Sequence, residues 1–66
     1  MTYRDAVKRF KAEVLPDLRA IESRGTGKID RPMRSEAWNI FTDSMCRAGE
    51  ITTRQYSFWQ TPRVCG

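Results

Sequence analysis

One helix ends and another begins within Gly49-Glu50-Ile51-Thr52-Thr53-Arg54-Gln55-Tyr56-Ser57-Phe58-Trp59. Gly49 can adopt the left-handed backbone conformation that commonly terminates a helix. Thr52 and Gln55 have the spacing of a capping box, in which each side chain accepts a hydrogen bond from the other residue's backbone amide. Ile51 and Tyr56 have the spacing of a hydrophobic staple. The segment therefore predicts two helices joined by a tight turn, which places the chain in the all-α class.

A hydrophobic stripe predicts a long first helix over residues 3–23. Thr2 is a suitable N-cap because Asp5 follows three residues later. Pro16 interrupts the helix, since proline has no backbone N–H to donate. The pattern leaves two possibilities, a kinked helix to about Ser23 or two pieces broken near Leu15, and the unbroken periodicity favours the kink. The stripe consists of Tyr3, Val7, Phe10, Val14, Leu18 and Ile21.

A glycine-containing linker separates this helix from a second one over residues 32–48. Asp30 is a better N-cap than Arg31, and Pro32 suits the first turn. Trp38 and Met45 widen the apolar arc of the helix to roughly 160°, which predicts packing between two partners. The other residues that share this face are Met33, Ala37, Ile40, Phe41, Ser44 and Ala48.

The third helix is short, over residues 53–60, because the residue before Pro62 is restricted to extended backbone. The tail, residues 61–66, is expected to be loose. The sequence thus predicts a single all-α domain over residues 1–66, built from three helices. Its first helix is long and kinked, and its last two helices form a hairpin like a helix-turn-helix.

Composition limits the possible functions. The 66 residues include 12 Lys and Arg against eight acidic residues, and no His. Without His the chain lacks the side chain most often used for proton transfer near neutral pH, and no carboxylate pair or activated nucleophile replaces it. Cys46 and Cys65 form neither a disulfide framework nor a zinc pattern. We therefore expect a binding protein rather than an enzyme, with no metal and no cofactor.

Hydropathy gives an expectation for location. No apolar run approaches the roughly 18 residues of a membrane span, and the N-terminus lacks a signal-peptide core. We expect a soluble cytoplasmic protein that does not contact a membrane.

Three segments resemble known site patterns, and each departs from its pattern. Gly25-Thr26-Gly27-Lys28 resembles part of a phosphate-binding loop, but a helix precedes it and Ile29 follows the lysine. A calcium loop around Gly49 would lack carboxylate ligands. A DNA-recognition helix over residues 53–60 would present mostly aromatic side chains, whereas such helices usually present polar and basic ones. A plain helical hairpin is the better interpretation.

Aromatic residues suggest a partner-binding surface. Seven aromatic side chains are more than three small helices can easily bury, and surplus apolar surface often marks association. Trp38 near Arg34 and Met45 has the composition of an interface anchor, and Phe58 points away from the other aromatics of its helix. We predict partner binding by Arg34, Trp38, Met45 and Phe58, and possible homo-oligomer formation through the broad face of residues 32–48.

Basic residues suggest a second surface. Arg24, Lys28, Arg31 and Arg34 cluster across the linker with few acidic residues between them. They could contact an acidic protein surface or neutralise nucleic-acid phosphates. A second stripe along the first helix is more simply a solvated face, formed by Arg4, Lys8, Lys11 and Arg19.

A family resemblance adds to this interpretation. The run Glu36-Ala37-Trp38-Asn39-Ile40-Phe41-Thr42-Asp43-Ser44-Met45-Cys46, followed by Gly49-Glu50-Ile51-Thr52 and by Gln55-Tyr56 to Trp59, resembles short helical proteins predicted in bacteriophage and prophage genomes. The resemblance implies a phage origin and carries over no activity and no functional residue.

The leading hypothesis is therefore a phage accessory protein that acts without catalysis. It would bind a host protein and inhibit a defence or nucleic-acid-processing complex, in the manner of an anti-CRISPR protein or a nuclease inhibitor. A small basic nucleic-acid-binding protein is the first alternative, and a virion or assembly component is the second.

Overall fold

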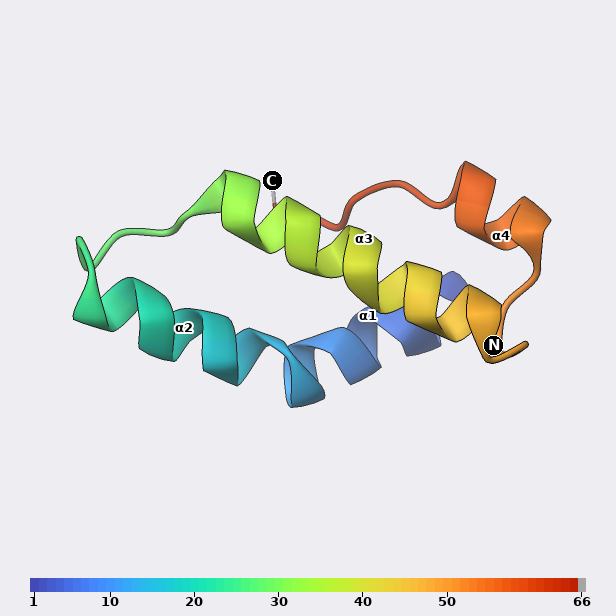
Figure 1. Cartoon of the computed structure of the whole chain (residues 1–66), viewed down its shortest axis with the longest axis horizontal. Coiled ribbons are helices and arrows are strands. Elements are labelled where there is room, and N and C mark those ends of the chain that lie inside the picture. Colours follow the sequence, from blue (N-terminus) through green and yellow to red (C-terminus); the bar gives the residue numbers. More distant parts are fainter. Residues whose placement is uncertain (66) are drawn as a thin grey trace.

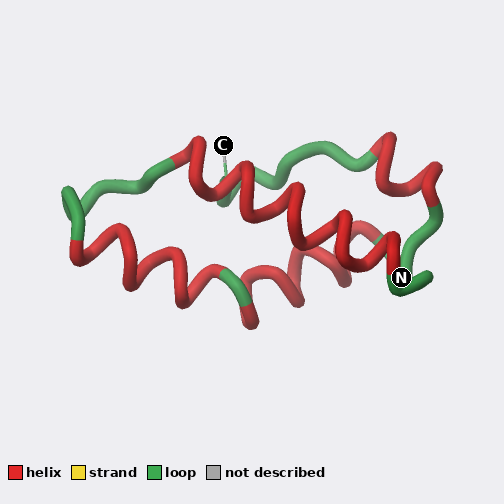
Figure 2. The backbone as a smooth tube through the Cα atoms, viewed as in Figure 1, coloured by secondary structure: helices red, strands yellow, loops and turns green. Residues whose placement is uncertain are grey.

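The computed structural model describes residues 1–65, and in these the chain forms four helices and no strand. They are α1 (Tyr3–Glu13), α2 (Leu15–Arg24), α3 (Arg31–Arg47) and α4 (Thr53–Phe58). Helices α1 and α2 follow one another along one side of the molecule, and α3 runs back past them (Figure 1). Figure 2 shows α4 at the opposite end from the α2–α3 linker, with the C-terminal segment returning along α3. The all-α prediction is confirmed.

The predicted helix starts are confirmed by their hydrogen bonds. Thr2 accepts a bond from the Asp5 amide at 3.2 Å, and Asp30 accepts one from the Met33 amide at 3.1 Å. The capping box is complete. Thr52 Oγ1 accepts from the Gln55 amide at 3.1 Å, and Gln55 Oε1 accepts from the Thr52 amide at 2.9 Å. Gly49, at φ 79°, provides the left-handed turn that separates α3 from α4.

The first helical region differs from the favoured prediction. It is divided at Val14 into α1 and α2, so the kinked continuous helix is wrong and the alternative of two pieces is correct. Pro16 cannot donate to the preceding turn, and the Val14 carbonyl instead accepts from the amides of Asp17 at 3.1 Å and Leu18 at 3.3 Å. Four helices therefore replace the predicted three.

The division also changes which side chains of α2 face the core. Helix α2 buries Leu15, Leu18 and Glu22, whereas Ile21 is 49% exposed. The predicted stripe includes Ile21 because it extends the periodicity of α1 through Pro16. The buried side chains of α2 form a different face, which shares Leu18 with that stripe.

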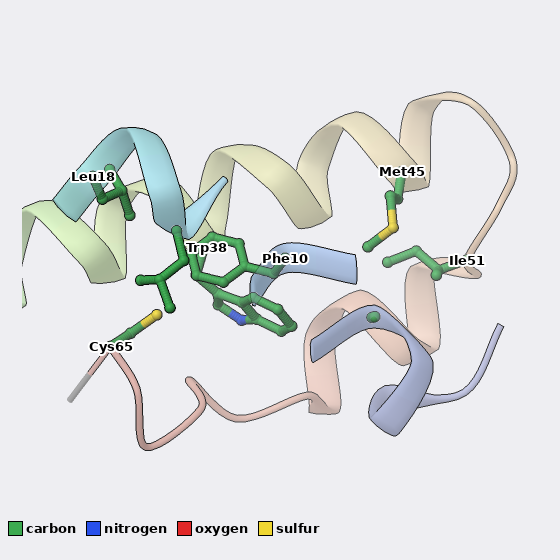
Figure 3. Close-up of a cluster of buried hydrophobic side chains, with 8 residues drawn as sticks. Phe10, Leu18, Trp38, Met45, Ile51 and Cys65 are labelled. Carbon is green, nitrogen blue, oxygen red and sulfur yellow. The ribbon is translucent and has the colours of Figure 1, made fainter. Parts of the chain in front are cut away.

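The core is centred on two aromatic rings. The side chains of Phe10 and Trp38 are fully enclosed, and their rings meet edge to face with centroids 5.4 Å apart, a favourable geometry for aromatic pairs. Figure 3 shows them between Leu18 on one side and Met45 and Ile51 on the other, with Cys65 below. This cluster holds the helices of a small chain together.

The buried face of α3 is shifted toward one edge of the predicted arc. Helix α3 buries Arg34, Trp38, Thr42 and Met45, and Met33, Ala37 and Phe41 pack against the core while partly buried. Ile40, at the other edge of the predicted arc, is 62% exposed. The observed face is rotated from the predicted one by roughly a quarter turn. The reason is that Trp38 packs against Phe10 and so sets the orientation of the helix.

The C-terminal segment is packed, which contradicts the predicted loose tail. Pro62 and Cys65 are buried. The Val64 carbonyl accepts a hydrogen bond from Arg34 Nη1 at 2.9 Å, and the Cys65 carbonyl accepts one from Ser35 Oγ at 3.4 Å. Periodicity within residues 61–65 could not indicate that they return to α3. Gly66, the last residue of the predicted tail, lies outside the described residues.

Candidate protein-binding surface around Phe58

Arg34 was predicted to contact a partner or a phosphate, and the structure places it inside the protein. It is 4% exposed and forms a bidentate ion pair with Glu22, with Nη2 to Oε1 at 2.6 Å and Nε to Oε2 at 2.8 Å. Glu22 also accepts a hydrogen bond from the Asp30 amide at 2.8 Å. These donors lower the pKa of Glu22, and the Glu22 hydrogen bonds raise the pKa of Arg34. Arg34 therefore ties α2, the linker and the C-terminal segment together, and it is not available to a partner in this conformation.

Trp38 and Met45 were predicted to anchor a partner, and the structure corrects their placement as well. They are 2% and 3% exposed, and both belong to the core. Since their side chains already have packing partners inside the chain, they cannot serve as exposed anchors here. Among the described residues of α3, Ile40 is the large apolar residue whose side chain is exposed.

Phe58 is the predicted partner-binding residue that does lie on the surface. Its side chain is 75% exposed, more than any other large apolar residue described. Two shallow hollows, of about 260 and 330 Å³, lie beside it. The first is lined by Tyr3, Phe58, Trp59 and Gln60, and the second by Arg54, Gln55, Phe58 and Trp59. We call these six residues the Phe58 surface.

Contacts to α1 and the N-terminus hold the Phe58 surface in place. The Tyr3 and Trp59 rings meet edge to face at 5.7 Å, and the Tyr3 hydroxyl donates to the Gln60 carbonyl at 3.0 Å. Partial burial raises the pKa of Tyr3 above its ordinary value. Gln55 Nε2 donates to the Met1 carbonyl at 2.9 Å. The hollows are therefore formed before any partner binds.

Sequence reasoning missed most of the Phe58 surface. It gave Trp59, which the structure leaves half-buried, no place on a binding surface, and it gave Tyr3 no role outside the first helix. The contact of Arg54 with Phe58 could have been predicted from the sequence, because Arg54 precedes Phe58 by one helical turn. Its guanidinium carbon lies 6.0 Å from the centre of the Phe58 ring. The contact of Tyr3 with Gln60 spans 57 positions and had no local signal.

The basic cluster keeps three of its four predicted members on the surface. Arg24, Lys28 and Arg31 are exposed, and no carboxylate within residues 1–65 lies at ion-pair distance from them. Arg24 Nε donates to the Ala20 carbonyl at 3.4 Å, at the C-terminal end of α2. This linker cluster lies at the opposite end of the long axis from α4 (Figure 1). A single ligand that covers both surfaces would have to span most of the molecule.

The buried titratable side chains Glu22 and Arg34 stabilise the fold. Glu22 and Arg34 neutralise each other, and every buried side-chain nitrogen or oxygen within residues 1–65 has a hydrogen-bond partner. Burial raises the pKa of the Cys65 thiol, while Arg34 acts in the opposite direction. In the part of the chain described, no three His, Cys, Asp or Glu residues come close enough to hold a metal ion. The Phe58 surface itself offers aromatic contact and one cation.

None of the described helices combines the length and the apolar character needed to cross a membrane. Comparison of the chain with known protein families, with curated proteins and with solved structures finds no match. The arrangement of the side chains is therefore the basis for assigning a function.

Proposed function

We propose that this protein is a non-enzymatic protein-binding module whose contact surface is the Phe58 surface. The observation that carries the proposal is the 75% exposure of Phe58 beside a half-buried Trp59. Fully burying a phenylalanine side chain is worth about 1.5–3 kcal/mol. A chain of 66 residues, with a core that rarely supplies more than about 3–5 kcal/mol, nevertheless leaves this ring in solvent. A partner that covers the ring would gain most of that energy.

The composition of the surface supports a protein partner. Aromatic residues and arginine are enriched where proteins meet, and a few of them usually carry most of the binding energy. The Phe58 surface has three aromatic rings and Arg54 around two hollows. Because contacts to Tyr3 and Met1 already order this surface, little conformational entropy is lost when a partner binds it.

The biological setting is part of the proposal. We propose a phage accessory protein that acts in the host cytoplasm and inhibits a host defence or nucleic-acid-processing complex. The resemblance of residues 36–59 to short phage and prophage proteins supports this setting. The absence of histidine from the sequence and the structural use of the buried Glu22–Arg34 pair support action by binding rather than by catalysis.

Affinity capture from bacterial lysates tests the proposal. Tagged wild-type protein is compared with Phe58→Ser and with the control Ile40→Ser, which removes an apolar side chain that is 62% exposed on α3. We expect a specific host protein to bind the wild type and the Ile40→Ser variant and to be lost with Phe58→Ser. Equal recovery with all three proteins, or no specific recovery from suitable hosts, would contradict the proposal.

Direct nucleic-acid binding is a second candidate, favoured by the exposed linker cluster Arg24, Lys28 and Arg31. Each phosphate contact releases a counterion, so affinity should fall steeply as salt rises. Gel-shift titration with single- and double-stranded DNA and RNA tests it. Replacing all three residues with Gln should reduce the salt dependence, whereas Arg54→Gln should not. No shift at low salt would reject this candidate.

A further inference from the structure

The two hollows share one wall. Phe58 and Trp59 line both of them, with Tyr3 and Gln60 completing the first and Arg54 and Gln55 the second. The larger, at about 330 Å³, is at the lower end of the roughly 300–1,000 Å³ of small-molecule pockets. It suits a side chain better than a whole cofactor. A segment that crosses Phe58 would place side chains on both sides of its ring.

The segment that carries this wall has charge of one sign only. Residues 51–65 include Arg54 and Arg63 and no Asp or Glu. Both arginines are exposed, and no carboxylate of the described residues lies within ion-pair distance of either. Arg54 lies over the Phe58 ring with its guanidinium carbon 6.0 Å from the ring centre. A cation without a counterion beside an apolar hollow is complementary to a carboxylate on a partner.

Two other occupants suit this surface less well. In a two-fold dimer through this surface, the same patch of both copies would meet, so each copy would bring Arg54 to the contact and neither would bring a carboxylate from residues 51–65. A nucleic-acid strand needs cations along its path as well as stacking rings. The linker cluster, which has three exposed cations, lies at the other end of the molecule from α4 (Figure 1).

We infer that the Phe58 surface binds an acidic protein segment that carries a bulky apolar side chain. This inference rests on the proposed function and adds the chemistry of the partner. The apolar side chain packs against Phe58 and Trp59, and a neighbouring Asp or Glu pairs with Arg54. Contact with the rings supplies most of the affinity, while the ion pair at the rim selects acidic partners and speeds their association.

An array of synthetic peptides with varied sequences, probed with the labelled intact protein, tests the inference. We expect bound peptides to be enriched in Asp and Glu beside Leu, Phe or Trp. Phe58→Ser should abolish binding, and Arg54→Glu should reverse the preference toward Lys and Arg. Lys28→Glu is the matched control, because it changes an exposed cation in the α2–α3 linker, at the opposite end of the molecule from α4 (Figure 1). Circular dichroism of each variant confirms that it is folded.

The outcomes separate this inference from the proposed function. Binding without acidic enrichment, an unchanged preference in Arg54→Glu, or no binding above the Phe58→Ser background would overturn the inference. Tighter binding of the same protein to single-stranded oligonucleotides than to any peptide would also overturn it. The proposed function would still stand if lysate capture depended on Phe58. If capture is independent of Phe58, the proposed function fails, whatever peptides bind.

Discussion

Arg34 of α3 and Glu22 of α2 form a bidentate ion pair in which each side chain is about 5% exposed. The pair also bonds the Asp30 amide and the Val64 carbonyl. Helix α2, the N-terminal end of α3 and the C-terminal segment thus meet at two side chains. A residue that sequence reasoning placed on a binding surface is instead the main polar connection within the fold.

Removing one partner of this pair should be strongly destabilising. Arg34→Met leaves the Glu22 carboxylate buried without its counterion, so we expect the melting temperature to fall by at least about 10 °C. Arg31→Met, on the same helix but exposed, is the control and should change it little. Thermal denaturation followed by circular dichroism measures both. Similar melting temperatures for the two variants would show that the pair does not hold the fold.

A double variant separates loss of the pair from loss of a single charge. Glu22→Met combined with Arg34→Met removes both buried charges, and replacing a buried ion pair with apolar residues is often neutral or stabilising. We expect the double variant to melt at a higher temperature than Arg34→Met alone. The Val64 carbonyl and the Asp30 amide lose their partners, so recovery should remain incomplete. A double variant less stable than Arg34→Met would contradict this interpretation.

Acid should weaken the fold through Glu22. Its pKa in the folded protein is lowered from the usual 4.5, chiefly by hydrogen bonds from Arg34. A carboxylate with a lowered folded pKa contributes stability above its unfolded pKa, and that contribution is lost as pH falls through the folded value. The melting temperature should therefore decrease as pH falls below about 4.5. In Glu22→Gln this part of the pH dependence should disappear, which melting curves between pH 7 and pH 2 would test.

The two cysteines should react at different rates. Cys65 is fully buried and its pKa is raised by burial, whereas Cys46 is partly exposed. The thiolate is the reactive form, so Cys46 should be labelled first by a maleimide in the native protein. Cys65 should react only when denaturant is added. Cys46→Ser and Cys65→Ser identify each site by mass spectrometry, and rapid native labelling of Cys65 would show that the C-terminal segment is not packed as described.

The capping box should contribute measurably to the stability of the α3–α4 turn. Thr52→Ala removes the acceptor of the Gln55 amide and should destabilise the protein by about 1 kcal/mol. For a domain of this size, that change corresponds to roughly 4–8 °C in melting temperature. Thr53→Ala, at the neighbouring exposed position, is the matched control. Equal effects of the two substitutions would mean that the cap is not formed in solution.

Local signals were enough to predict three helix starts and one turn. The caps at Thr2, Asp30 and Thr52 and the turn at Gly49 depend on residues within four positions of each other, so the sequence contains all that determines them. The orientation of α3 depends on the contact of Trp38 with Phe10, and the packing of the C-terminal segment depends on Arg34. These contacts join residues 28 or more positions apart, which periodicity within one helix cannot reveal.

The candidate site was predictable only in part. Phe58 could be recognised because its position on the helix points away from Tyr56 and Trp59. Tyr3 and Gln60 come together only when the two ends of the chain meet. Arg34, Trp38 and Met45 were misplaced because interface anchors and core residues have the same composition, and only tertiary structure distinguishes them.

Trp38 belongs to the core, and the exposed aromatic ring of Phe58 lies on α4. Acrylamide quenching of tryptophan fluorescence tests this directly in the protein alone. In Trp59→Phe, the remaining Trp38 should be shielded and quenched several-fold less than free tryptophan, and unfolding in urea should abolish the difference. If native Trp59→Phe is quenched as readily as the unfolded chain, Trp38 is open to solvent, which would contradict its place in the core.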